Sequence, residues 1–350
     1  MITGHSFPLW VPGPKSDPFG NSYPGIPEVR ARLKAICALP QTVCTHTSFH
    51  TVNEVRTGIR AYSELNSPTA IPLGEVKKAL KDNGKKNLAV TVPAFGQPDL
   101  WNGGAILSND PAIRLRSRDL IYEGAEMCLN LLEEGLGEGV FIWWPATDSL
   151  RYPHTEYDLR SGRERLINYW AEVLTKYPKL RIWLEWKPAD PGDRDYFAYY
   201  KEAIAFAWAV NYLVGRVAVL LNFEFAHASI CGDNVEEVTA AILEPATVLN
   251  IVDVLREYLG IEIDNVPLAQ MISTATLVDL IVHVNSSVNK GPDQDKRVGA
   301  VNNEETQGAI KRLDACPQRV IAEHDIKCLD GKPIAYYEQS VAALEEMRVA

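Results

Sequence analysis

Acidic and histidine side chains recur in this chain at the ends of short apolar runs. Apolar runs of four to eight residues that stop at turn residues are typical of buried strands. An unpaired carboxylate beside such a run is costly to bury, so several of them together indicate a compensating cation. The residues in these positions are Glu185, Glu224, His227, His283, Asp293, Asp295 and Asp325.

The donor types suggest which cation this would be. Mixed carboxylate and imidazole ligation suits Mg²⁺, Mn²⁺ or Co²⁺ better than an ion that prefers thiolates. Seven candidate ligands are more than one ion needs. The sequence therefore predicts two divalent cations per subunit that share a bridging carboxylate, roughly 4 Å apart or somewhat more.

The elements that must position these residues alternate along the chain. Segments with apolar residues at helical spacing separate the apolar runs. Asp110-Pro111 is expected to begin one helix, and Gly135 and Gly260 are expected to end two. The expected strands lie near 5–10, 42–46, 87–93, 139–144, 180–186, 217–224, 278–284 and 319–325.

Eight alternations of strand and helix predict an α/β fold, a closed (β/α)8 TIM barrel, more than an open doubly wound sheet. We expect one catalytic domain over 1–335 and a C-terminal helix over 336–350 that packs on the barrel. In such barrels catalytic groups lie where strands end and the following loops begin. Each of the seven candidate ligands lies at or just beyond such a point.

Two local patterns refine the site. Glu224 and His227 form E-x-x-H, and they share a site only if the chain bends where the strand ends, because an extended strand would separate them. Lys187 lies two residues beyond Glu185 and so on the same face of its strand. Beside cations, Lys187 can donate a proton to a substrate oxygen, although a simple salt bridge to Glu185 is an equal alternative.

Composition narrows the class of protein. The chain has 350 residues, of which 46% are hydrophobic and 23% charged, as in an ordinary globular protein. A formal net charge of −10 argues against a nucleic-acid surface. Six scattered cysteines without a CxxC pair, no secretory leader and no long apolar run favour a reduced, cytoplasmic protein that does not interact with a membrane.

The ordered motifs resemble those of the xylose isomerase superfamily of metal-dependent aldose–ketose isomerases, and most closely the L-rhamnose and xylose isomerase type. His283 matches rhamnose isomerases, where xylose isomerases carry aspartate, whereas Glu224 matches xylose isomerases, where rhamnose isomerases carry aspartate. The matching pieces are Glu185-x-Lys187-Pro188, Glu224-x-x-His227, His283, Asp293-x-Asp295 and Asp325-x-Lys327.

The resemblance implies a role for each residue. The first metal would be held by Glu185, Glu224, His283 and Asp325, and the second, bridged by Glu224, by His227, Asp293 and Asp295. Lys187 would act at the carbonyl oxygen, and Asp295 or a metal-bound hydroxide would be the base if protein-assisted proton transfer occurs. The substrate pocket would be formed by Trp10, His46, Phe95, Lys187 and Trp143 or Trp144, with His46 a further catalytic candidate.

The implied activity is interconversion of an aldose and a ketose, by metal-assisted hydride shift or by enediol proton transfer between C1 and C2. The implied assembly is a homodimer or homotetramer. An epimerase or dehydratase of the same superfamily is the first alternative. A metal-dependent nuclease acting at abasic DNA sites and a non-catalytic sugar-binding barrel are further alternatives, disfavoured by the net charge and by the ligand set respectively.

Overall fold

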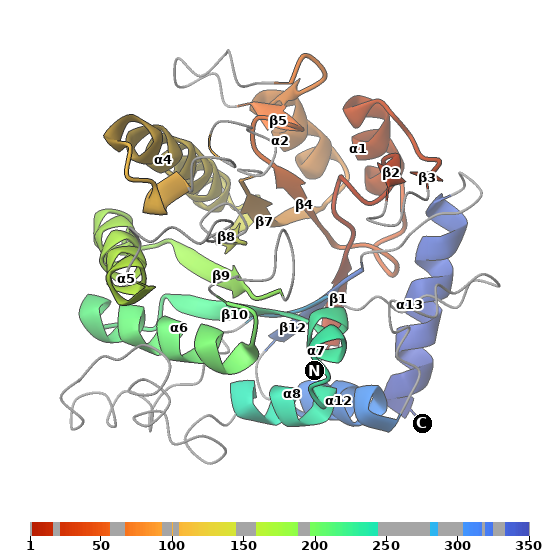
Figure 1. The fold of residues 1–350 in the computed structure, drawn as a ribbon. Helices are drawn as coiled ribbons and strands as arrows, with labels where there is room; N and C mark the ends of the chain where they lie inside the picture. The colour runs from red at the N-terminus through yellow and green to blue at the C-terminus, as the bar shows by residue number, and fades with distance from the viewer. Residues whose placement is uncertain are drawn as a thin grey trace.

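A barrel of parallel strands forms the centre of the molecule in a computed structural model (Figure 1). The structure describes residues 2–16, 22–56, 67–92, 100, 105–144, 159–187, 197–243, 281–285, 304–316, 319–324 and 333–349. Around the barrel, the strands follow the order β1-β12-β11-β10-β9-β8-β7-β4 and close on themselves. They are β1 (Ile2–Ser6), β4 (His46–His50), β7 (Lys86–Thr91), β8 (Gly137–Trp143), β9 (Arg181–Glu185), β10 (Val219–Glu224), β11 (Ile281–Asn285) and β12 (Arg319–Glu323).

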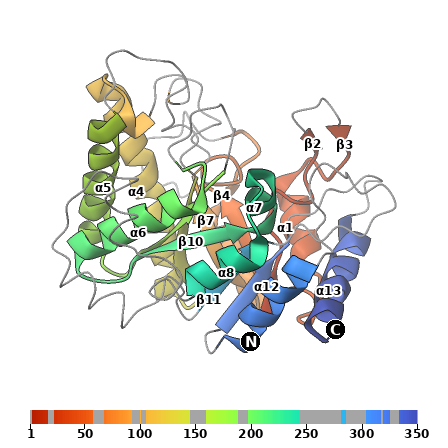
Figure 2. The same cartoon turned by 60° about the horizontal axis from the view of Figure 1, so that its bottom comes forward.

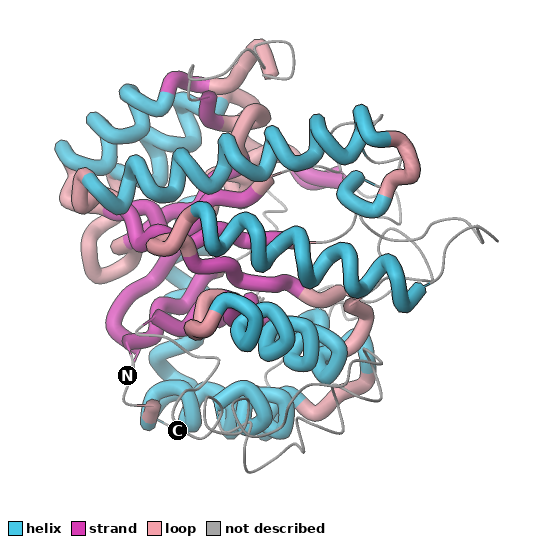
Figure 3. The backbone as a smooth tube through the Cα atoms, turned by 90° about the vertical axis from the view of Figure 1, so that its left-hand side faces the viewer, coloured by secondary structure: helices cyan, strands magenta, loops and turns pink. Residues whose placement is uncertain are grey.

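Helices surround the strands on the outside, as Figures 1 and 3 show from two directions. Two short strand pairs, β2 (Lys15–Ser16) with β3 (Ser22–Tyr23) and β5 (Val55–Arg56) with β6 (Ile71–Pro72), lie apart from the barrel. The helices are α1 (Val29–Cys37), α2 (Leu73–Asp82), the 3-10 turn η3 (Ala105–Leu107), α4 (Pro111–Glu133), α5 (Leu159–Lys176), α6 (Tyr200–Val214), α7 (Phe225–Cys231), α8 (Val235–Leu243), α12 (Glu304–Ala315) and α13 (Pro333–Val349).

The α/β class and the ring of parallel strands agree with the sequence prediction. Residues 244–280 and 286–303 lie outside the described residues, so the complete alternation of strand and helix and the single-domain organisation stay predictions. One irregularity has a clear cause. Where β7 pairs with β8, the register shifts between Asn87 and Ala89, because β8 carries one extra residue at this point. Gly139 lies in this bulge with a φ of +70°, a conformation that glycine adopts without strain.

Apolar cores on both sides of the strands stabilise the barrel. Inside it, a small core is dominated by Trp183, which is 1% exposed and packs with Leu88, Val140, Leu220 and Ile321. A much larger core lies between the strands and the helices. A filled interior means that substrate can reach polar side chains only beyond the apolar layer, at an end of the barrel.

The first two strands differ from their predicted positions. β1 spans Ile2–Ser6, although its hydrogen bonds along β4 continue beyond it, from Phe7 N to His46 O and from Leu9 N to Ser48 O. β4 begins at His46, where the sequence predicted that it would end. The strand His46–His50 is buried along nearly all of its length but contains few apolar residues, so its hydrophobic pattern was too weak to position it.

Helix signals were more reliable. The Asp110 side chain accepts a hydrogen bond of 2.8 Å from Ala112 N, and Pro111 is the first residue of α4, as predicted. Gly135, with φ +70°, follows the end of the same helix, also as predicted.

Figure 2 shows α13 ending close to the N-terminus of the chain. No helix in the described part of the chain has both the length and the hydropathy needed to cross a bilayer.

Candidate metal centre

Three of the predicted ligands meet where β9 and β10 end. Glu185 is the last residue of β9, Glu224 is the last residue of β10, and His227 lies in α7 directly after it. One ligand atom from each of these three residues lies within 4.8 Å of the others. We call these three residues the mouth cluster, because they stand at the carboxyl ends of the barrel strands, where catalytic groups of such barrels are found.

The bend that the E-x-x-H pattern required is present. The strand stops at Glu224 and the helix starts at Phe225, so Glu224 and His227 lie one helical turn apart and face the same way. Nε2 of His227 lies 3.3 Å from an Oε2 of Glu224, and its Nδ1 lies 3.9 Å from Oε1 of Glu185. The imidazole therefore stands between the two carboxylates.

Burial keeps the His227 imidazole neutral. The side chain is almost fully enclosed, and this desolvation, reinforced by the positive charge of Lys187, holds the pKa of His227 well below its usual range, while the Trp186 backbone acts in the opposite direction. Nδ1 of His227 is shielded from solvent and has no hydrogen-bond partner among the described residues. A neutral imidazole with an unused nitrogen beside two carboxylates is a suitable ligand for a divalent cation.

Neighbouring side chains orient the cluster. Asn222, two residues before Glu224 on the same strand face, donates a hydrogen bond of 2.9 Å to Oε2 of Glu185. Lys187 lies with its Nζ 4.9 Å from the centre of the Trp144 ring. Such support of a ligand by a second layer of residues is usual in metal sites. The donor set therefore fits a divalent cation, with Glu185, Glu224 and His227 as its described ligands.

The structure leaves the remaining predicted ligands untested. His283 lies in β11, with its backbone beside Ile321 of β12, but its side chain is outside what the structure describes. Asp293, Asp295 and Asp325 also lie outside the described residues. Their roles, and with them the second cation, stay predictions.

His46 is at the wrong end of the barrel for the role predicted for it. It is the first residue of β4, and its Nε2 lies 3.2 Å from Oε1 of Glu138, the second residue of β8. Both residues are at the amino-terminal ends of their strands, opposite the mouth cluster. His50, at the carboxyl end of β4, was missed; its ring lies 4.4 Å from that of Trp10, and its Nδ1 lies 3.3 Å from Glu54.

Trp143 is also misassigned, because it faces the helices. Its ring packs against Trp170 of α5, Phe206 of α6 and Phe197, at centroid distances of 4.7, 5.6 and 5.9 Å. Side chains alternate along a strand, so the next residue, Trp144, takes the other direction and lies beside Lys187. Of the two tryptophans considered, Trp144 is the one near the mouth cluster. Phe95 lies outside the described residues.

The sequence reading also missed a buried carboxylate. Glu323, the last residue of β12, is 1% exposed and accepts hydrogen bonds from Ser6 Oγ at 2.9 Å and Ser48 Oγ at 2.5 Å. It shares a strand face with Ile321, which lies in the barrel interior. Strict alternation along the run from 319 to 325 would have put Glu323 on the same predicted strand face as Asp325 and so identified it as a candidate.

A second group of buried histidines lies on the other side of the strands. His324 Nε2 lies 3.0 Å from His5 Nδ1, and His324 Nδ1 lies 2.6 Å from Ser340 Oγ of α13. We call His5, His324 and Ser340 the helix-side cluster. Burial holds the pKa of His324 well below its usual range, with a smaller contribution from His5.

Comparison with known proteins gives the fold but no close relative. No protein-family model matches the sequence, and no curated protein matches it. Among solved structures, an L-ribulose 3-epimerase superposes with a TM-score of 0.59 at 13% identity, covering 100% of this chain and 95% of the other. A D-allulose 3-epimerase from Methylomonas sp., in complex with D-allulose, gives 0.58 at 11% identity, with 99% and 97% covered. A xylose isomerase domain protein from Alicyclobacillus acidocaldarius gives 0.54 at 12% identity, with 99% and 98% covered. The chain therefore has the fold of xylose isomerase-like TIM-barrel proteins, as the motif resemblance predicted.

Proposed function

We propose that this protein is a divalent-cation-dependent enzyme that moves hydrogen at a carbon beside the carbonyl group of a small sugar. The observation that carries the proposal is the mouth cluster, in which Glu185, Glu224 and His227 converge within 4.8 Å at the carboxyl ends of β9 and β10. The similarity in fold to sugar epimerases and to a xylose isomerase domain protein supports the substrate class.

The chain's own residues supply positioning and proton transfer. A bound divalent cation would polarise the carbonyl oxygen and the neighbouring hydroxyl of the sugar. Lys187 would donate a hydrogen bond to a substrate oxygen, and a mouth-cluster carboxylate would take up the proton that leaves carbon. Asn222 would keep Glu185 in one orientation through its hydrogen bond of 2.9 Å. Trp10 and Trp144 would exclude water from the sugar carbons.

Two reactions use such a site. Epimerisation of a ketose at C3 has the support of two of the solved structures, which are 3-epimerases of ketoses. Aldose–ketose isomerisation, the reaction expected from the sequence, has the support of the Glu224–His227 pair and of Lys187, which are parts of the isomerase motif pattern. We place epimerisation first, because several solved structures spanning almost the whole chain are epimerases.

One assay separates the two reactions. The purified protein would be stripped of metal, reloaded with Mn²⁺ and incubated in D₂O with a panel of ketoses and aldoses, and the products identified by NMR. An epimerase gives the C3 epimer of a ketose with deuterium at C3. An isomerase gives the corresponding aldose, without deuterium for a hydride shift or with it for an enediol route.

Variants tie the activity to the site. Glu185→Gln should abolish turnover, whereas Glu236→Gln, which alters an exposed carboxylate paired with Arg312 on the outer helices, should leave it unchanged. The proposal fails if no sugar in the panel is converted by the metal-loaded protein, or if Glu185→Gln is as active as the unmodified chain.

A further inference from the structure

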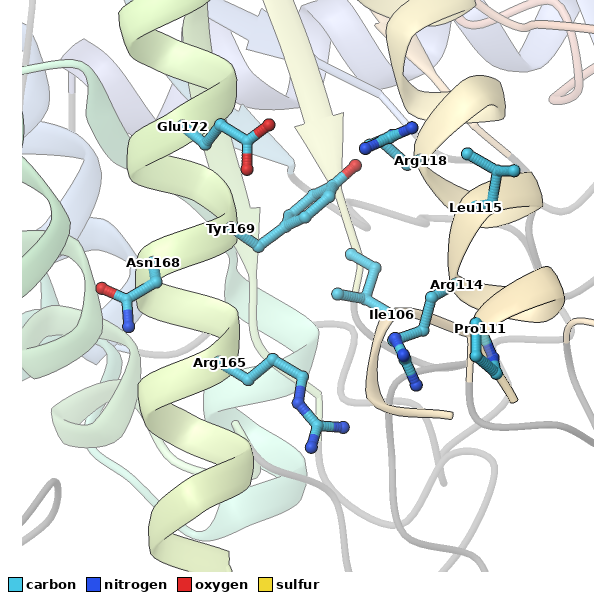
Figure 4. Close-up of a pocket in the computed structure, with 9 residues that line it drawn as sticks. All are labelled: Ile106, Pro111, Arg114, Leu115, Arg118, Arg165, Asn168, Tyr169 and Glu172. Carbon is cyan, nitrogen blue, oxygen red and sulfur yellow. The ribbon is translucent and has the colours of Figure 1, made fainter. Parts of the chain in front are cut away.

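A groove of about 690 Å³ lies between α4 and α5 on the outside of the barrel (Figure 4). The turn η3 contacts both helices and lines the groove with Ile106. Three arginines line it, Arg114 and Arg118 from α4 and Arg165 from α5, against one carboxylate, Glu172. We call this the arginine groove. An excess of positive charge is notable in a chain whose formal net charge is −10.

Two of the guanidinium groups are held in place without being neutralised. Arg114 Nη1 donates a hydrogen bond of 2.6 Å to Ser108 O, and Arg165 Nη1 donates one of 3.0 Å to Leu107 O. Both acceptors are uncharged carbonyl groups at the end of η3. Each guanidinium therefore keeps its full charge and most of its donors. Figure 4 shows the two groups at the same end of the groove, reaching into it from opposite helices.

The third arginine and the carboxylate lie toward the other end of the groove (Figure 4). Arg118 Nε is shielded from solvent and has no hydrogen-bond partner among the described residues. Glu172 is engaged with Tyr122 of α4: burial and the Glu172 charge raise the pKa of the Tyr122 hydroxyl. In the described part of the chain, no carboxylate forms an ion pair with Arg114, Arg118 or Arg165, so their charges are available to a ligand.

We propose that the arginine groove binds the phosphate group of a small organic phosphate. Two guanidinium forks that approach from different helices can donate to several oxygens of one tetrahedral dianion, whereas a carboxylate would be satisfied by a single fork. The apolar lining from Ile106 and the ring of Tyr169 would contact the organic part of the ligand. Because both forks also hold η3, which precedes α4 in the chain, binding would stabilise this turn against the two helices.

The test is direct binding, which does not depend on the proposed sugar chemistry. Inorganic phosphate and a hexose 6-phosphate would each be titrated calorimetrically into the metal-free protein, with NaCl at matched ionic strength as the salt control. Arg114→Gln and Arg165→Gln should each weaken binding about tenfold or more. Arg165→Lys, which keeps the charge but loses the fork, should weaken it less. Arg312→Gln, which removes an exposed arginine of α12, should bind like the unmodified chain.

Each result decides the proposal. Saturable binding of hexose phosphate, tighter than that of inorganic phosphate and lost in the groove variants, supports a site for an organic phosphate. Equal binding of both probes assigns the groove to inorganic phosphate alone and overturns the organic part. Binding that is absent, or unaffected in groove variants that circular dichroism shows to be folded, overturns the site. A groove variant that changes only the oligomeric state would assign the groove to a protein contact instead.

Discussion

Two buried histidines, His227 and His324, differ in how their ring nitrogens are used. Both are almost fully enclosed, and burial lowers the pKa of each. In the helix-side cluster both nitrogens of His324 have close polar neighbours, His5 at 3.0 Å and Ser340 at 2.6 Å. In the mouth cluster Nδ1 of His227 has no hydrogen-bond partner among the described residues, and two carboxylates stand beside the ring.

The difference indicates what each cluster does. Leaving a buried polar atom unsatisfied costs about 1–3 kcal/mol. In the helix-side cluster this cost is met by hydrogen bonds, so the cluster fastens α13 to the barrel. In the mouth cluster Nδ1 of His227 has no hydrogen-bond partner among the described residues, and a cation bound beside the ring would provide one. Burial alone therefore does not distinguish the two histidines, which differ in how many of their ring nitrogens have a polar partner among the described residues.

The largest effect is expected from removing a mouth-cluster charge. Glu224→Gln should lower the affinity for Mn²⁺ by at least about 100-fold, since even residues that only support a ligand typically contribute 10–100-fold. Isothermal titration of the metal-free protein would measure it. The matched control is Glu345→Gln, which alters a carboxylate 3.7 Å from His5 Nε2 in the other region and should leave metal affinity unchanged. Unchanged affinity in Glu224→Gln would remove the distinction between the clusters.

The second test changes the helix-side cluster and measures stability instead of metal affinity. His324→Ala should reduce the free energy of unfolding by about 2–4 kcal/mol, because it opens a cavity and deprives His5 and Ser340 of a buried partner. Chemical denaturation would measure the change. Metal affinity should stay as in the unmodified chain. His227→Gln should show the opposite pattern, with metal affinity reduced and a smaller loss of stability in the metal-free protein.

The two regions also differ in how far the sequence determined them. β9 and β10 were predicted at 180–186 and 217–224 and are found at Arg181–Glu185 and Val219–Glu224. Their apolar runs end abruptly at the carboxylates, so the strand ends and the candidate ligands Glu185 and Glu224 were predicted together. The bend that brings His227 back toward Glu224 was required by the motif and is present.

β4 shows why His46 was misplaced. Its residues HTSFH are buried on both faces but mostly polar, because they hydrogen-bond across the barrel, as Ser48 does to Glu323. Hydrophobic periodicity cannot position such a strand. A displacement of four residues exchanged His50 for His46 and moved the predicted histidine to the opposite end of the barrel. Trp143 and Trp144 are adjacent in the chain at the end of β8, so their side chains point to opposite faces. Choosing Trp143 instead of Trp144 therefore put the predicted pocket residue on the helix side.

The pH dependence of stability would sharpen the comparison further. The unfolded chain binds protons at histidine near pH 6.5, whereas folded His324 does not until the pH is well below that value. The unfolded state therefore binds more protons, and stability falls as the pH is lowered from about 6.5 toward the lowered pKa of His324. Its contribution is at most about 1.4 kcal/mol per pH unit. His5, whose pKa burial also lowers, acts in the same direction.

Denaturation curves at several pH values between neutral and acidic would measure this slope. His324→Gln should flatten it, because the group that takes up the proton only on unfolding is gone. An unchanged slope in that variant would assign the acid sensitivity to other groups, and the helix-side cluster would lose its proposed part in acid unfolding.

The smallest effect should come from Asn222, which touches the mouth cluster without being a ligand. Asn222→Ala removes the hydrogen bond of 2.9 Å to Glu185 Oε2 and frees the carboxylate to rotate. Metal affinity should fall about tenfold, at the low end of the range for residues that orient a ligand. Asn222→Gln keeps the amide but moves it by one methylene, so it should not restore affinity. If Asn222→Ala binds Mn²⁺ as tightly as the unmodified chain, Asn222 does not orient Glu185 for metal binding.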